Sequence, residues 1–189
     1  MVGLAILSIL LSMAVPTMKS WLTSTSAAAA AEFYVEGFKL ARAEAVKRNA
    51  VTRLVLTQNA KSKQLDWQID LCVPTSLAPC GPGVGSWSTP TATNTDAHAA
   101  DFKSIARKAD NLPGTGVLTL TPQPANTSTV YFTPLGWVDT TVASRLEQLK
   151  LDPVVADAFP ASAVFVTLAG VVTKCNPAVA STDSRSCPP

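Results

Sequence analysis

Cysteines are the residues of this sequence whose type and spacing point to the most definite chemistry. The chain contains four of them, Cys72, Cys80, Cys175 and Cys187. Structural zinc sites usually use short Cys-x-x-Cys pairs, whereas the spacings here are longer and fall in segments with Pro and Gly. We therefore expect disulfide-closed loops and no metal. Pairing by proximity joins Cys72 with Cys80 and Cys175 with Cys187, but four cysteines permit three connectivities and the crossed ones stay open.

The histidine and the carboxylates form no pattern that is typical of a catalytic site. His98 is the single histidine of the chain and is flanked by alanines, where a solvated side chain is the ordinary outcome. Asp66 and Asp70 alternate with apolar residues, so we expect them on the solvated face of a strand. The sequence has no Gly-x-Ser-x-Gly, His-Glu-x-x-His or glycine-rich phosphate-binding motif. We predict a protein that is not an enzyme and needs no cofactor.

The overall charge and the cysteines bear on where the chain works. The 15 basic and 13 acidic residues give a formal charge of +2, which is too balanced to attach the protein to nucleic acid or anionic lipid by net field alone. Any such binding needs a local patch. Because disulfides persist in oxidising compartments, the expected cysteine loops place the globular part outside the cytoplasm.

The elements that carry these residues begin with an apolar N-terminal segment. No Asp, Glu, Lys or Arg precedes Lys19. A helix of about 18 residues reaches about 27 Å, close to the hydrocarbon thickness of a bilayer. A secretory signal peptide would have basic residues before the apolar run, and a core helix would have a polar stripe. We predict that residues 1–20 are a transmembrane anchor that also sits in a helical bundle.

The helical pattern continues past this anchor. Ala27 through Ala31 strongly favour helix, and the residues that follow place apolar and charged side chains on opposite sides of it. The sequence predicts one long helix to about Asn49, with residues 21–50 amphipathic. Pro16 removes a backbone donor, so a kink or a short melted stretch is expected over residues 14–19. The apolar side is Tyr34, Phe38, Ala41 and Ala45, and the charged side is Glu32, Glu36, Lys39 and Lys47.

From residue 51 the periodicity changes to two, which predicts a β-rich head domain over residues 51–189. Residues 73–100 are rich in Pro, Gly, Ser and Thr and predict a long loop. Trp67 is expected in the core and Trp87 on the surface. The fold class is therefore α+β, with a long N-terminal helix packed on a small antiparallel β-sheet domain. Strands are expected at 52–57 and 64–71, with a hairpin over 59–63, and at 117–121, 129–133, 145–151, 163–168 and 171–174, the last two turning at Gly170.

This organisation resembles the type IV pilins and pseudopilins, and most closely the GspH/FimT family of minor pilins. Residues 4–16 look like the second part of the pilin methylation motif. Residues 38–48 look like the family's Leu-x-x-Ala-Arg-x-Glu-Ala-x-x-Arg helix end, and residues 130–136 and 164–175 resemble a strand-and-turn and the closing cysteine hairpin. The family's basic leader, cleavage-site Gly and following Glu are absent, so we expect the true start to lie upstream of Met1.

The resemblance implies a structural subunit near the tip of a type IV pilus that takes part in pilus assembly or priming. Its apolar helix would contact other major and minor pilins, and an inner-membrane assembly machinery would extract it from the bilayer. The implied location is the bacterial inner membrane as a single-pass protein, with the head in the periplasm and later in the pilus at the cell surface. A type II secretion pseudopilin shares the fold and stays an alternative.

DNA is the alternative partner, because some members of the FimT branch look like DNA receptors for natural transformation that rely on arginines near the C-terminus. The candidates in this chain are Arg145, Lys150, Lys174 and Arg185. Binding through phosphates needs several such charges to converge. The tail has one Arg beside one Asp, so we expect these residues to be solvated surface charges.

Overall fold

The computed structural model describes residues 2–73, 80–88 and 103–188, and for residues 2–17, Lys19 and Val73 it describes the backbone alone. One long helix is followed by short strands, so the predicted α+β class is confirmed. The elements are α1 (Val2–Arg48), β1 (Thr52–Gln58), β2 (Leu65–Val73), β3 (Ser86–Trp87), β4 (Ile105–Arg107), β5 (Leu118–Gln123), β6 (Thr129–Phe132), β7 (Gln148–Pro153), β8 (Ser162–Val166) and β9 (Val172–Cys175).

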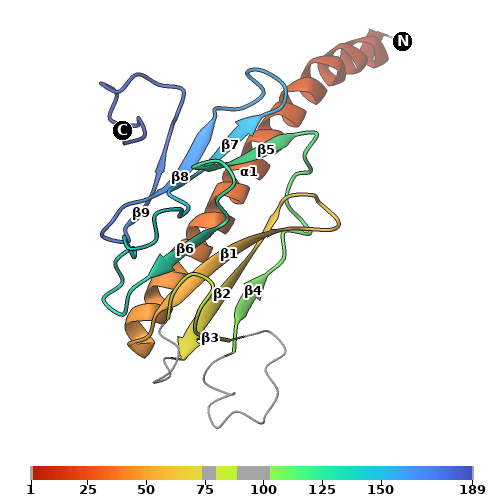
Figure 1. Ribbon diagram of the computed structural model, residues 1–189. Coiled ribbons are helices and arrows are strands. Elements are labelled where there is room, and N and C mark those ends of the chain that lie inside the picture. Colours follow the sequence, from red (N-terminus) through yellow and green to blue (C-terminus); the bar gives the residue numbers. More distant parts are fainter. Residues whose placement is uncertain (1, 74–79, 89–102, 189) are drawn as a thin grey trace.

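The strands form two antiparallel sheets that both contact α1 (Figure 1). The first sheet has the order β3-β2-β1-β6, with β4 also pairing with β2, and the second has the order β5-β7-β8-β9. The predicted hairpins β1–β2 and β8–β9 are both present. The sequence missed β3 and β4, because strands of two and three residues are too short to show a periodicity. Residues 74–79 and 89–100 of the predicted loop lie outside the described residues.

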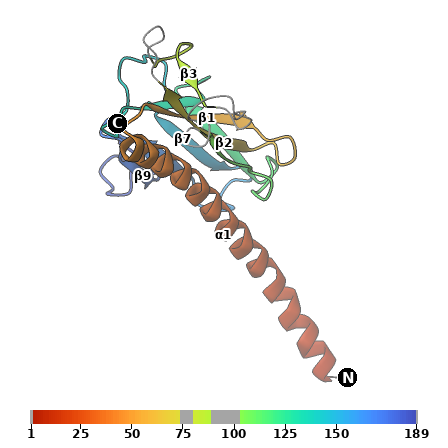
Figure 2. The same cartoon turned by 90° about the horizontal axis from the view of Figure 1, so that it is seen from below.

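Helix α1 is continuous over 47 residues, which confirms the single long helix. The head domain lies along its second half, and the first half extends beyond the head (Figure 2). Residues 14–19 are helical throughout, so the melted stretch is wrong, whereas the kink at Pro16 stays a prediction. Asn49 ends the helix with a positive φ of 48°, and Lys47 and Arg48 complement the dipole of the last turn.

The side chains of the predicted anchor at residues 2–17 lie outside the described residues. Where the structure does describe the chain, it contains no helix with both the length and the apolar character needed to cross a bilayer.

The apolar side of α1 forms the centre of the core, as predicted. Tyr34 and Phe38 are each 1% exposed, and Trp67 of β2 is buried in the same core. The Trp67 indole Nε1 donates to the Phe33 carbonyl at 3.0 Å, and the Tyr34 hydroxyl donates to the Leu65 carbonyl at 2.9 Å. Burial raises the pKa of the Tyr34 hydroxyl above its ordinary value. These two hydrogen bonds between α1 and β2 fix the position of α1 along the first sheet.

At Gly37 the helix α1 lies close to the first sheet. A Cβ at this position would lie 3.0 Å from the ring of Trp67, which its bond to Phe33 prevents from moving. Alanine gains about 1 kcal/mol in helix propensity, but the overpacking costs more, so Gly37→Ala should lower the free energy of unfolding by about 1 kcal/mol. Urea unfolding of the detergent-solubilised full chain measures this. A stabilised variant would show that the ring yields. Ala43→Gly, at an exposed helix position, calibrates the propensity alone.

Candidate interaction surfaces

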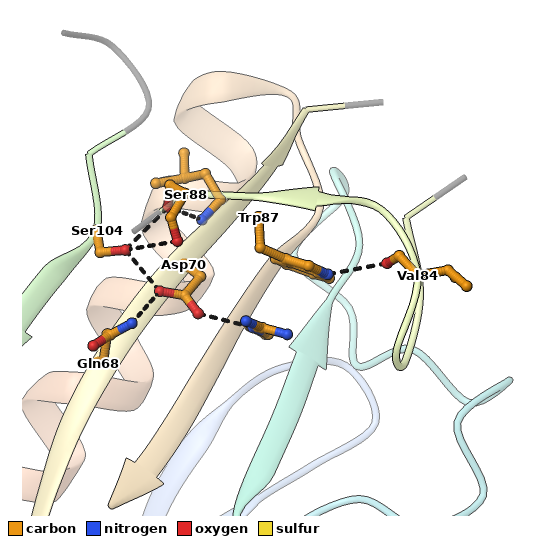
Figure 3. A network of polar contacts seen from close by, with 8 residues as sticks. Gln68, Asp70, Val84, Trp87, Ser88 and Ser104 are labelled. Atoms are coloured by element: carbon orange, nitrogen blue, oxygen red, sulfur yellow. Dashed lines mark hydrogen bonds and ion pairs between the residues drawn. The ribbon is translucent and has the colours of Figure 1, made fainter. Parts of the chain in front are cut away.

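A buried polar network lies on the face of the first sheet that points away from α1. Its centre is Asp70 on β2, which is 1% exposed. One carboxylate oxygen accepts from Arg53 Nε at 2.8 Å, and the other accepts from Gln68 Nε2 at 2.6 Å and from Ser104 Oγ at 2.7 Å (Figure 3). The prediction that Asp70 is a solvated strand residue is therefore wrong. The side chain is buried because segments distant in sequence fold over this face of β2.

The same network holds the short strand β3. The Arg53 guanidinium lies 4.3 Å from the centre of the Trp87 ring, and the rings of Trp87 and Tyr131 pack in an edge-to-face manner. Ser88 Oγ accepts from the Leu71 amide at 2.9 Å. Trp87 is therefore half-buried and not exposed as predicted. We call Arg53, Asp70, Trp87, Ser88 and Ser104 the loop clamp.

The other predicted strand carboxylate, Asp66, is also engaged. It is half-buried and accepts from Asn59 Nδ2 at 2.7 Å and from the Ala109 amide at 2.6 Å. Asp66 therefore ties the β1–β2 hairpin to the segment that follows β4, and the expectation of a solvated side chain is wrong here too. Both carboxylates act as structural acceptors in the described fold.

Both disulfides are present, as Cys72–Cys80 and Cys175–Cys187. The first closes a loop beside the loop clamp. The second closes the C-terminal tail next to α1, where the tail helps to line a cavity of about 450 Å³ together with Ala27 and Phe159. The two bridges therefore stabilise opposite ends of the head.

Two of the four predicted DNA-binding residues, Lys174 and Arg185, line this cavity. Each is paired with an acidic side chain: the Lys174 ammonium with Glu32 of α1, and Arg185 with Asp183 at 2.8 Å. Hydrogen bonds from Arg185 lower the pKa of the Asp183 carboxyl to about 2 and raise the pKa of the Arg185 guanidinium. The positive charge of both residues is locally compensated.

The other two candidates point elsewhere. Arg145 pairs with Glu147 at 3.0 Å, and its guanidinium is largely buried. Lys150 pairs across the sheet with Ala163, which in turn pairs with Cys175, so these three side chains lie on the same face. Lys174 precedes Cys175 on β9, and its side chain therefore projects from the opposite face of the second sheet. The structure therefore does not bring the four cations together.

The ion pair between Lys174 and Glu32 has a measurable consequence for acid stability. The hydrogen bond and charge of Lys174 hold the pKa of Glu32 below its ordinary value of 4.5. A lowered pKa in the folded state contributes stability above pH 4.5, and this contribution is lost as the pH falls through the folded-state pKa.

Lys174→Ala should therefore raise the pKa of Glu32 towards 4.5 and make the acid-side loss of stability shallower. Carboxyl-detected NMR titration of the detergent-solubilised full chain measures the pKa directly. Lys39→Ala is the matched control, because Lys39 lowers this pKa only through its charge and is the smallest contributor. Equal shifts in the two variants would contradict the assigned cause.

At the C-terminal end of α1, two glycine turns meet the helix. Gly136 and Gly170 have φ values of 78° and 73°, and a Cβ on Gly170 would lie 2.0 Å from the Gly136 carbonyl oxygen. Arg42 Nε donates to that carbonyl at 3.1 Å. Large apolar residues around this contact are 47–71% exposed, and we call them the distal patch. They are Val46, Leu135, Trp137, Leu168 and Val171.

The part of the chain that the structure describes contains no cluster of metal-ligating side chains, since no group of three or more His, Cys, Asp and Glu side chains in it is placed to hold a metal ion. His98 lies outside the described residues. The exposed apolar side chains that stand out are those of the distal patch and, further towards the N-terminus of α1, Met18, Trp21 and Leu22.

Comparison with known proteins gives a match to a family model. The family model of the type II transport protein GspH matches residues 30–167, from the second half of α1 through β8. No curated protein and no solved structure matches the chain. The match includes the loop clamp and most of the distal patch.

Proposed function

Because the chain belongs to the type II transport protein GspH family, we propose that it is a minor pilin subunit that takes part in assembling or priming a type IV pilus. Proteins of this family are pilin-like, envelope-associated structural subunits of type II secretion or type IV pilus machines. The proposed place is near the tip of the filament. Before assembly, the proposed location of the subunit is the inner membrane, with its head in the periplasm.

The observation that carries the proposal is that α1 extends beyond the head and exposes large apolar side chains where it does so (Figure 2). One side of its second half is buried against the head, while its first half extends away from every described strand (Figure 2). Where the helix leaves the head, Met18, Trp21 and Leu22 are 63%, 64% and 49% exposed. Large apolar side chains gain about 1.5–3 kcal/mol each when they are removed from water, so this stretch favours packing with lipid or with other helices.

The test is deletion of the gene in its host, with complementation by the full chain at native level. We expect surface pili to be lost and to return with the wild-type chain. Loss of secretion with normal pili would assign the subunit to a type II secretion machine instead. Normal pili and normal secretion in the deletion strain would contradict the proposal.

Two sets of complementing variants sharpen this test. Trp21→Glu with Leu22→Glu should fail to restore pili at normal protein level, because it places charge on the exposed apolar stretch. Ser20→Glu is the matched control, since it adds a charge in the same turn without removing apolar surface. A chain with Arg145, Lys174 and Arg185 changed to Gln should restore both pili and DNA uptake; lost uptake with normal pili would favour a DNA receptor.

A further inference from the structure

Most of the distal patch is carried by two turns of the same form. The turn after β6 reads Thr-Pro-Leu-Gly-Trp over residues 133–137, and the turn between β8 and β9 reads Thr-Leu-Ala-Gly-Val over residues 167–171. In each turn the glycine amide donates to the threonine carbonyl at 2.8 Å. The amide of the last residue donates to the threonine hydroxyl, at 3.3 Å in the first turn and 3.0 Å in the second. The apolar side chains of the patch therefore stand on turns with a fixed shape.

The turns expose apolar side chains while their backbone groups bond internally. Leu135 is 71% exposed, and Trp137 and Leu168 are each 59% exposed. In both turns the threonine amide donates to the carbonyl of the last residue, at 2.8 Å and 3.0 Å, and the Gly136 carbonyl accepts from Arg42. Backbone groups that are already bonded suit contact with an apolar medium, which offers them no polar partner. A protein strand that docks by its main chain needs such groups to be free.

The end of α1 beside these turns is basic. Residues 39–48 contain four basic residues and one acidic residue, a net charge of +3. The acidic residue, Glu44, is 6% exposed, and its carboxylate accepts from Arg48 Nε at 2.6 Å. A groove of about 560 Å³ lies between this helix end and the β8–β9 turn, and it is lined by Lys39, Arg42 and Lys47. An anionic group in the groove would therefore lie among cations and next to apolar side chains.

Tryptophan and leucine flanked by Lys and Arg are typical of surfaces that bind the interface of an anionic bilayer. Tryptophan rings favour the headgroup level, leucine side chains favour the acyl boundary, and the cations attract anionic headgroups. Met18, where α1 leaves the head, and Val46 in the patch are about 42 Å apart along the helix axis. A lipid surface at the distal patch is therefore separate from whatever covers the projecting half of α1.

We propose that the distal patch binds the surface of an anionic lipid bilayer. Leu135, Trp137 and Leu168 enter the headgroup region, and the basic residues of the groove face the lipid phosphates. This inference goes beyond the proposed function, because it adds a membrane contact at the end of the head that is remote from the N-terminus of α1.

Vesicle flotation of the full chain tests this contact. The chain is placed in nanodiscs of phosphatidylcholine, which cover the projecting half of α1, and is mixed with vesicles of phosphatidylcholine alone or of an equal mixture with phosphatidylglycerol. We expect the loaded discs to float with the anionic vesicles and to show an at least about tenfold lower partition coefficient on phosphatidylcholine alone. Empty discs should stay behind. Equal partition on both vesicles, or chain that floats without the disc scaffold protein, would overturn the proposal.

Variants test which side chains make the contact. Trp137→Ser with Leu168→Ser should lower the partition coefficient on anionic vesicles by about tenfold, and Lys47→Gln should lower it by about fivefold. Val154→Ser with Val155→Ser is the matched control and should change nothing, since these residues are 48% and 66% exposed between β7 and β8. An equal loss in the control, or no loss with Lys47→Gln, would overturn the assignment to the distal patch.

A carboxylate-bearing protein segment is the competing occupant of the patch. A photoreactive residue at position 135 of the full chain, crosslinked in the intact host, should give lipid adducts detectable by mass spectrometry. Adducts with proteins alone would overturn the proposal.

Piliation of the deletion strain keeps this inference separate from the proposed function. Pili that depend on the chain, without vesicle binding, would leave the minor pilin role intact and reject the lipid contact. Vesicle binding by a chain whose deletion leaves pili and secretion normal would reject the minor pilin role and retain the contact.

Discussion

Replacing Asp70 by Ala is expected to lower the free energy of unfolding by about 3 kcal/mol, near the lower end of the range for breaking a buried ion pair. The carboxylate is 1% exposed and accepts from Arg53, Gln68 and Ser104. Its removal leaves these donors without their acceptor in a half-buried site. The Arg53 side chain is 26% exposed and recovers some hydration, which keeps the effect below the upper end of that range.

Urea unfolding followed by tryptophan fluorescence reports this change, because Trp87 lies on the guanidinium of Arg53. Asp183→Ala removes a carboxylate whose partner Arg185 is 72% exposed, and it serves as the control, with a much smaller effect expected. A similar unfolding midpoint for Asp70→Ala and the wild type would show that the loop clamp does not stabilise the head.

Replacing Gly170 by Ala is expected to cost a comparable amount, about 3 kcal/mol, from backbone strain together with overpacking. The new Cβ would lie 2.0 Å from the Gly136 carbonyl oxygen and 3.0 Å from Arg42 Nε. Neither the backbone oxygen nor the residue that donates to it can move without separating the β8–β9 turn from α1.

Gly83→Ala provides a matched control for Gly170→Ala. Gly83 has nearly the same φ, 72°, but a Cβ there meets nothing within 4 Å. It should therefore show only the backbone cost of about 1 kcal/mol. If the two variants unfold at the same urea concentration, the close contact between the glycine turns contributes nothing.

The matched motif at the end of α1 illustrates what local sequence could and could not show. The Ala-Arg-x-Glu-Ala pattern at residues 41–45 supports a helix end and a family resemblance. It does not show that Arg42 bonds a carbonyl 94 residues away, or that Glu44 is buried. A side chain's partner across such a separation depends on how the turns close, which is not a local property.

The predicted DNA site illustrates the same limit. Arg145, Lys150, Lys174 and Arg185 are close to the C-terminus in sequence, yet strand alternation puts Lys150 and Lys174 on opposite faces. Three of the four cations pair with carboxylates. The periodicity of the sequence predicts the strands, but the register that sets these faces comes from cross-strand pairing.

By itself the sequence determined the long helix, its apolar side, the two hairpins and the α+β class, because these depend on side-chain periodicity and on turn residues within a few positions. Only the tertiary structure decided that Asp70 is buried and that Gly136 meets Gly170. Those features join residues far apart in the chain. Their environment is set by which strands pair and where each turn contacts the helix.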